Sequence, residues 1–513
     1  MMTFTRRNFI KKVSQGTVVL CAPILLRKDL NAMLKDIPQA GNDASAYFSR
    51  FGIDEAVIQQ VMAAALQKGG DYCDLFFQHS LSNYIGLEDQ DVNRAYSDIA
   101  LGVGIRVLKG DQTGYSFTED LSLKSMKLAA LTAAEIANDT KKVGPQNLTY
   151  YPSENYYPTN VPWETVGIEQ KIPFLEKVNT LVYEKDTRIT KSRLSFYDNI
   201  SYILVATSEG TLHTDYQPMT GLTVTCIAEQ NGRRESNGYN LSARQDVRFF
   251  TPERLDELAS EGVRRTVILF DAVKPAPGEM EVVLASGSAG ILLHEAIGHG
   301  MEADFNRKNV SIYADKLNKP IAKEFVSIVD DGTNLNVRGS INVDDEGIPS
   351  QKTVLVENGI LRTYMHDRIS AKFYKVAPTG NGRRESFRYA PLPRMRNTYM
   401  LPGPHKTEEI IRSVKKGIYA ETFTNGEVFI GAGDFTFYVK YGFLIEDGKL
   451  TQPIKDVNII GNGPKVLENI VMVADDFKMA KGGWTCGKNG QGVPVSMGLP
   501  TVKVSSITVG GIS

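Results

Sequence analysis

The stretch at residues 291–300 constrains this chain most, because it places two histidines around one glutamate. His294 and Glu295 are adjacent, and His299 follows them in the pattern H-E-x-x-x-H. Two imidazoles can bind a metal ion through neutral ring nitrogens, and a carboxylate beside them can move a proton. The chain has only 6 histidines. Their pairing around one glutamate therefore favours a catalytic metal centre over two structural histidines at a helix end.

The spacing of the two histidines means that both cannot point at one ion from an unbroken α-helix. Residues five positions apart on an α-helix of ~3.6 residues per turn point roughly 140° away from each other. Gly298 and Gly300 flank the second histidine, and glycine permits a helix to bulge or to end. We therefore expect a strand at 281–285, then a short helix with a distortion that turns His299 back toward His294.

The rest of the chain predicts an α+β protein. Residues 48–140 and 164–272 each combine amphipathic helices with alternating strands, which predicts an N-terminal region of antiparallel sheets with covering helices. From 278 to 513, short strands and glycine-rich turns predict a β-rich, barrel-like catalytic domain. Segments at 140–163 and 271–278, which are rich in turn-forming residues, mark the boundaries. The net charge of −1 and the lack of a basic stripe argue against nucleic acid as a partner.

Residues 1–40 have the form of a twin-arginine export signal. Residues 5–11 (TRRNFIK) hold two adjacent arginines, and a short apolar run follows at 17–26. A helix over that run spans only ~15 Å, which is too short for a bilayer core of ~30 Å. We therefore expect export by the twin-arginine route and a periplasmic or membrane-associated protein. The alternative is a basic arm on a cytoplasmic protein.

The third ligand of the predicted centre has several candidates. A catalytic zinc usually has three protein ligands and one open position. The candidates beside the two histidines are Glu302, Asp304, His366, His405 and Cys486. Proximity in sequence favours Glu302, whereas the glycine-dense surroundings favour Cys486. Glycines let a backbone approach a site closely, and a thiolate is a strong zinc ligand. The alternative for Cys486 is a free thiol on a flexible loop.

A second polar stretch holds candidates for substrate binding. Asn381, Arg383 and Arg384 lie in the segment TGNGRRES, and guanidinium groups suit carboxylates and peptide carbonyls. A solvated loop whose charges pair internally is an equal alternative. The acidic run VDDEG at 343–347 lacks the ligand spacing of a calcium loop, so it predicts a tight turn.

With these motifs the chain resembles the TldD/PmbA family, in its metal-bearing, TldD-like branch. The resemblance rests on HEAIGHGMEADFNRK, VDDEG, PTGNGRRES, PRMRNT and CGKNGQGVPVSMGLPTVKVSSITVGG, and it covers the chain after about residue 50. It implies a zinc metallopeptidase with an N-terminal α/β region and a C-terminal β-rich region. It also implies one Zn²⁺ per metal-bearing subunit, held by His294, His299 and Cys486, with Glu295 as the catalytic residue.

The resemblance further implies a partner and a substrate class. Family members form dimers, often with a PmbA/TldE-like paralogue that lacks the metal motif, and they cleave small or unfolded peptides, including the leaders of modified peptide antibiotics. The export signal departs from the family's usual cytoplasmic location. We expect peptide hydrolysis with Glu295 as general base, by a dimer of this chain with itself or with such a paralogue. The alternatives are a non-catalytic binding or partner subunit, and an amidase or esterase with the same chemistry.

Overall fold

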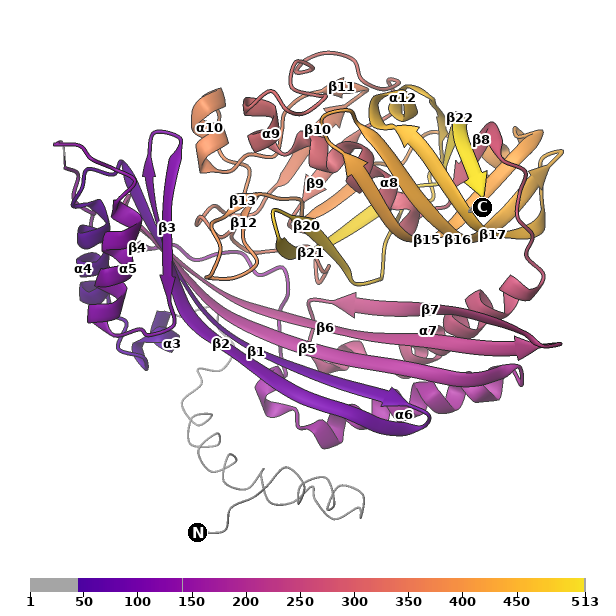
Figure 1. Ribbon diagram of the computed structural model, residues 1–513, viewed down its shortest axis with the longest axis horizontal. Helices are drawn as coiled ribbons and strands as arrows, with labels where there is room; N and C mark the ends of the chain where they lie inside the picture. Colours follow the sequence, from indigo (N-terminus) through magenta and orange to yellow (C-terminus); the bar gives the residue numbers. More distant parts are fainter. Residues whose placement is uncertain (1–44, 141, 512–513) are drawn as a thin grey trace, which may run out of the picture. The chain divides into compact units, whose positions relative to one another are not determined.

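The computed structural model describes residues 45–140 and 142–511. The predicted export signal therefore lies outside the described residues. Within these residues, no helix is both long enough and apolar enough to span a bilayer. Figure 1 shows a long sheet formed by the N-terminal half of the chain and a second, β-rich region formed by the C-terminal half.

The long sheet has the strand order β3-β2-β1-β5-β6-β4, with β7 paired to β6. Its strands are β1 (Tyr72–Glu88), β2 (Asp91–Lys109), β3 (Gln112–Thr118), β4 (Thr149–Tyr150), β5 (Ile189–Thr207), β6 (Thr211–Gln230) and β7 (Arg233–Ala243). Strand β1 pairs antiparallel with β5 along most of its length, from Asp74 to Glu88. Because of this long-range pairing, the two N-terminal stretches that the sequence suggests as separate units share one sheet.

Helices cover the face of the long sheet that is turned away from the C-terminal region (Figure 1). They are α3 (Ser45–Ser49), α4 (Glu55–Leu66), α5 (Leu123–Ala134), α6 (Ile168–Lys185) and α7 (Pro252–Val267). Helix α7 shows why these residues form a helix. The Thr251 side chain accepts a hydrogen bond from the Arg254 N–H and Pro252 opens the first turn, as expected of a good helix start. Buried residues then recur at helical spacing and pack onto the sheet: Leu255, Leu258, Ala259, Gly262, Val263 and Thr266.

The C-terminal region contains a closed barrel, which confirms the predicted α+β class and barrel-like catalytic domain. Five strands follow one another in the order β17-β16-β15-β8-β22, and an additional pairing between β17 and β22 closes the ring. They are β8 (Gly278–Leu284), β15 (Lys416–Phe429), β16 (Asp434–Glu446), β17 (Lys449–Asn462) and β22 (Val502–Gly511). Strand β18 (Ile470–Val473) extends the sheet beyond β22. Closing a sheet in this way removes its exposed edges.

A second sheet lies beside the barrel and brings the end of the chain close to its middle. Its order is β11-β10-β9-β14-β21-β19, with β20 paired to β21. The strands are β9 (Ile328–Asp331), β10 (Lys352–Glu357), β11 (Ile360–Leu361), β14 (Asn397–Met400), β19 (Lys478–Met479), β20 (Trp484–Lys488) and β21 (Gln491–Leu499). The barrel and this second sheet share one apolar core, which contains Ile328, Met400, Val439, Val495 and Val504.

Buried ion pairs connect the long sheet to the C-terminal region. Arg106 in β2 lies 2.6 Å from Asp74 and 2.6 Å from Glu346, and all three side chains are buried. Glu346 belongs to the acidic run VDDEG, which forms a tight turn as predicted. In that turn the Gly347 N–H donates to the Asp344 carbonyl at 3.0 Å. Because two carboxylates meet one guanidinium away from water, each charge depends on the others for compensation.

Replacement of Arg106 by methionine tests this connection. The variant Arg106→Met should lower the free energy of unfolding by about 3–5 kcal/mol, because the buried Glu346 loses its guanidinium partner and Asp74 keeps only that of Arg384. The matched control is Lys68→Met, which removes an ion pair to Glu135 whose side chains are 40% and 65% exposed, and which should cost at most about 1 kcal/mol. Equal shifts of the two unfolding midpoints in denaturant would show that the buried pairs do not hold the regions together.

Candidate metal centre

The two histidines lie on a short helix that is widened where the sequence requires it. Helix α8 (Ile291–Leu293) is α-helical, but residues His294–Gly298 form a π-helical turn, η5. The His299 N–H donates to the His294 carbonyl, five residues back. In such a turn, residues five apart lie one above the other, and π-turns are frequent at functional sites. The two imidazole rings consequently lie 5.1 Å apart, at 85° to each other.

Close packing holds the π-helical turn in place. A β-carbon added at Gly298 would lie 2.0 Å from the Met395 sulfur. On another side, one added at Gly463 would lie 2.2 Å from the Ala296 carbonyl oxygen. Gly463 opens helix α12 (Gly463–Glu468), which packs against η5. Glycine therefore fits both positions because the Met395 side chain at Gly298 and the Ala296 carbonyl at Gly463 leave no space for a β-carbon.

Cys486 joins the two histidines, although it lies far from them in the sequence. It sits in β20, and its Sγ lies 3.4 Å from His299 Nε2. One potential ligand atom from each of His294, His299 and Cys486 lies within 4.8 Å of the others, and all three residues are buried. The His294 Nδ1 is buried without a hydrogen-bond partner. The structure thus brings together three donors that suit zinc.

The other candidates for the third ligand lie elsewhere. The Glu302 carboxylate is 3.0 Å from His299 Nδ1, on the opposite side of that ring from Cys486. Asp304 accepts a hydrogen bond from Lys488 at 2.7 Å. His366 packs against Tyr374, and His405 contacts a backbone carbonyl. Glu302 follows His299 by only three residues, but its carboxylate lies at Nδ1 of that ring, whereas Cys486 lies at Nε2.

The electrostatics of the cluster favour a cation. Burial alone would raise the pKa of the Cys486 thiol, but the imidazoles of His294 and His299 bring it well below its ordinary value. Burial also opposes the ionisation of Glu302, yet Lys488 and His299 lower its pKa to about 2. The negative charges of Glu302 and Cys486 raise the pKa of His299 well above its usual value, although burial opposes this. Two anionic groups around two imidazoles fit a bound metal ion.

Glu295 lies beside the three donor residues without belonging to their set. Its Oε2 is 3.9 Å from His299 Nε2, and its side chain is 14% exposed. Burial raises its pKa above the usual value of a glutamate, while His294 and His299 partly offset this. A carboxylate in this environment is a stronger base than one in water, and it can exchange protons with groups bound at the centre.

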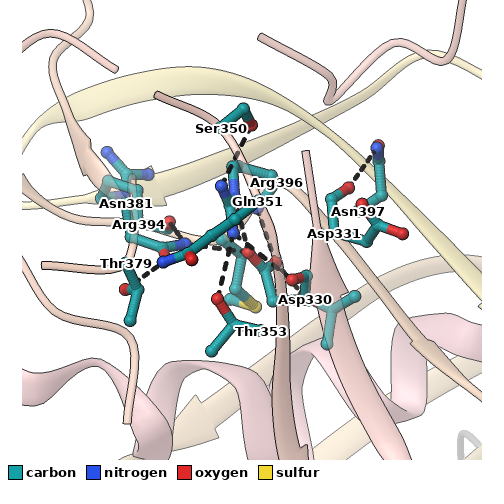
Figure 2. A network of polar contacts seen from close by, with 12 residues as sticks. Asp330, Asp331, Ser350, Gln351, Thr353, Thr379, Asn381, Arg394, Arg396 and Asn397 are labelled. Carbon is teal, nitrogen blue, oxygen red and sulfur yellow. Dashed lines mark hydrogen bonds and ion pairs between the residues drawn. The ribbon is translucent and has the colours of Figure 1, made fainter. Parts of the chain in front are cut away.

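The three residues predicted to bind substrate are buried and bonded within the protein. Asn381 donates through Nδ2 to Asp330 at 2.8 Å and to the Arg394 carbonyl at 2.8 Å (Figure 2). Arg383 donates to two backbone carbonyls, at 2.5 and 2.8 Å. Arg384 donates to a carboxylate at 3.2 Å and to a carbonyl at 2.8 Å. Their substrate-binding role stays a prediction. The contacts favour the internally paired loop, which is buried rather than solvated.

Comparison with known proteins finds related metallopeptidases. Residues 277–511, 161–270 and 73–137 match the models described as the PmbA/TldA metallopeptidase C-terminal domain, central domain and domain 1. The metalloprotease TldD homolog of Haemophilus influenzae is 39% identical over 448 residues, which cover 86% of this chain and 93% of that protein. The zinc metalloprotease TldD homolog of Saccharolobus solfataricus is 29% identical over 456 residues, 87% of this chain and 98% of that protein.

A solved structure shows the same fold. TldE from Thermococcus kodakarensis superposes with a TM-score of 0.70 at 18% identity, and the match covers 89% of this chain and 100% of that one. The fold, the clustered donors and the relatives together define a metallopeptidase. More closely, the chain belongs to the PmbA/TldD metallopeptidase family.

A pair of glycine substitutions tests whether packing sets the geometry of the centre. Gly463→Ala should push the Ala296 carbonyl away, cost about 1–3 kcal/mol by overpacking, and lower the amount of metal bound. Gly487→Ala is the control, because an added β-carbon there meets nothing within 4 Å although Cys486 is adjacent. Metal content and thermal midpoint should fall for the first variant and stay constant for the second. Equal metal content in both would mean that the position of η5 does not matter.

Proposed function

We propose that the chain is a zinc-dependent peptidase that hydrolyses small or unfolded peptides, with Glu295 as general base. The carrying observation is the convergence of His294, His299 and Cys486 on one point beside Glu295. Two imidazoles and a thiolate form a donor set that zinc prefers. The relative from Saccharolobus solfataricus, which is called a zinc metalloprotease, supports the same metal.

The residues of the centre have distinct roles in the proposed reaction. Bound zinc would supply a water molecule with a pKa of about 7 and would polarise the scissile carbonyl. Glu295 would accept the proton from that water and deliver it to the leaving amine. Its raised pKa suits this exchange, because the carboxylate must be able both to take up the proton and to release it. Glu302, on Nδ1 of His299, leaves Nε2 of that ring for the metal.

The peptide would lie along the free edge of β15. This strand pairs with β8 over residues 417–420, and beyond them it pairs with β16 alone within the part of the chain that the structure describes. Three irregularities in the pairing with β16 bend β15 in this part. A β-carbon added at Gly426 would lie 3.3 Å from Glu295 Cγ, so this part of β15 lies beside the proposed base. An extended peptide added there would be bound through its backbone, which suits unfolded substrates of varied sequence.

Glu295→Gln tests the role of the base. The variant should lose about 10²- to 10⁴-fold in kcat on an unfolded peptide while it keeps its zinc, since the amide cannot take up the proton. Cys486→Ser should instead lower the zinc content. Glu324 is exposed, and the control variant Glu324→Gln should change neither kcat nor the zinc content. Peptide cleavage by Glu295→Gln at the wild-type rate would remove Glu295 from the mechanism. Wild-type protein that cleaves no peptide would favour a non-catalytic partner subunit or an amidase.

N-methylated peptides test the proposed edge. Methylation of alternate backbone nitrogens of a good substrate should reduce kcat/KM by about fivefold or more at every second position, because each lost hydrogen bond is worth about 1 kcal/mol. Alanine substitutions at the same positions are the control and should have small effects. Strong dependence on side chains, with no alternation along the backbone, would contradict binding along β15.

The predicted dimer, with a second copy or with a PmbA/TldE-like paralogue, and the predicted twin-arginine export stay predictions. The described residues do not include the export segment.

A further inference from the structure

The segments that carry the three donor residues are not joined by a backbone ladder. His294 begins η5 and His299 follows it in η6 (His299–Met301), whereas Cys486 belongs to β20, which pairs with β21 among the described residues. Side-chain contacts between β20 and the segment of the histidines can therefore contribute directly to the distance from Cys486 to the imidazoles.

A buried ion pair provides this connection. Lys488 follows Cys486 by two residues in β20, so the two side chains point to the same face of the strand. Its Nζ lies 3.2 Å from Glu302 Oε2, and the same oxygen lies 3.0 Å from His299 Nδ1. Because Cys486 Sγ lies 3.4 Å from His299 Nε2, the four residues form a closed ring. Glu302 and Lys488 are only 0% and 7% exposed.

Further contacts hold the Lys488 side chain in this position. Its Nζ donates to Asp304 Oδ1 at 2.7 Å and to the Pro393 carbonyl at 3.1 Å. It also lies 4.2 Å from the centre of the Phe305 ring. Two carboxylates, a carbonyl and an aromatic face thus surround one ammonium group, which stabilises its charge beside a cation site.

Arg394 holds β20 from a second direction. Its guanidinium donates to the Cys486 carbonyl at 2.5 Å and to the Gln491 carbonyl at 3.3 Å. Its own backbone is fixed by Asn381, whose carbonyl accepts from the Arg394 N–H at 2.9 Å and whose amide donates to the Arg394 carbonyl. Figure 2 shows that Asn381 in turn bonds to Asp330, which also accepts a hydrogen bond from Arg396.

We propose that Glu302 and Lys488 are positioning residues, which hold His299 and Cys486 in a metal-binding arrangement before the ion is bound. Glu302 accepts a hydrogen bond from the Nδ1–H of His299 and so leaves the lone pair of Nε2 on the side of Cys486. Lys488 ties that carboxylate to the strand of Cys486. The inference rests on the proposed metal centre. It adds Glu302 and Lys488, which would orient the proposed ligands without contacting the ion.

The test is the zinc affinity of the full chain, measured by competition with a chromophoric chelator. Glu302→Gln should weaken zinc binding about 10- to 100-fold, because an amide can donate as well as accept and no longer selects one tautomer of His299. Lys488→Met should also weaken zinc binding. Either variant can test the inference if the other folds poorly. The Co²⁺-loaded variants should also show a changed thiolate-to-cobalt absorption band, because the direction of the Cys486 sulfur is altered.

The matched control is Lys503→Met. Lys503 is likewise buried, and its Nζ lies 2.6 Å from Glu281 in the barrel, away from the three donors. This variant also loses a lysine ion pair, but its zinc affinity and cobalt spectrum should equal those of the wild type.

The outcomes separate the inference from the proposed function. Wild-type protein that binds no zinc would overturn both. Zinc binding by the wild type together with affinities within twofold in Glu302→Gln and Lys488→Met would overturn the positioning role alone. An equal loss of affinity in Lys503→Met would also overturn it, because general destabilisation would then be sufficient.

Discussion

The hydrogen bond from the His299 N–H to the His294 carbonyl is the constraint on which the metal centre depends. An α-helical turn would point the two imidazoles apart, whereas the wider turn stacks them along one side. A π-turn is rare and needs support from its surroundings. Here Met395 packs against Gly298, and helix α12 packs against the turn through Gly463. Neither glycine has space for a side chain. The glycines therefore act through packing, since neither has the positive φ that would require glycine for backbone reasons.

Buried charges hold the loops that surround the centre. Arg106, Arg394 and Arg396 are among the largest fully buried side chains of the described chain, and each bonds to carboxylates or carbonyls from a different segment. Such pairs add little net stability, but the removal of one partner leaves the other unpaired in the interior. Their importance here follows from the local structure, because the segments around residues 332–350 and 375–396 have few backbone ladders to fix them. The polar network takes over the role that a sheet has elsewhere.

Much of this arrangement could be predicted from local sequence signals, and the remainder depends on long-range contacts. The spacing of His294 and His299 requires a helix distortion if both bind one ion, and the distortion is present. Short strands and glycine-rich turns after residue 278 predict the barrel. The pairing of β1 with β5 carries no local signal, so the sequence does not predict the shared N-terminal sheet. The polarity of Asn381 and Arg384 is visible in the sequence and suggests that they bind a ligand. Their buried hydrogen-bond partners cannot be identified from the sequence. Lys488 had a usable signal, since its position two residues after Cys486 in a strand places both on one face.

The charges around the centre explain why a lysine and an arginine are tolerated so close to a cation site. Cys486, Glu295, Glu302 and Asp304 can each carry a negative charge, against the positive charges of Lys488 and Arg394. With all four groups ionised, four negative and two positive charges leave a surplus of two negative charges, which the proposed divalent ion would balance. Without Lys488 and Arg394, the buried carboxylates would repel one another and would compete with Cys486 for the metal. In the proposed centre, Lys488 and Arg394 attract the Glu302 carboxylate to the Nδ1 side of His299, which leaves two imidazoles and one thiolate as the proposed donors.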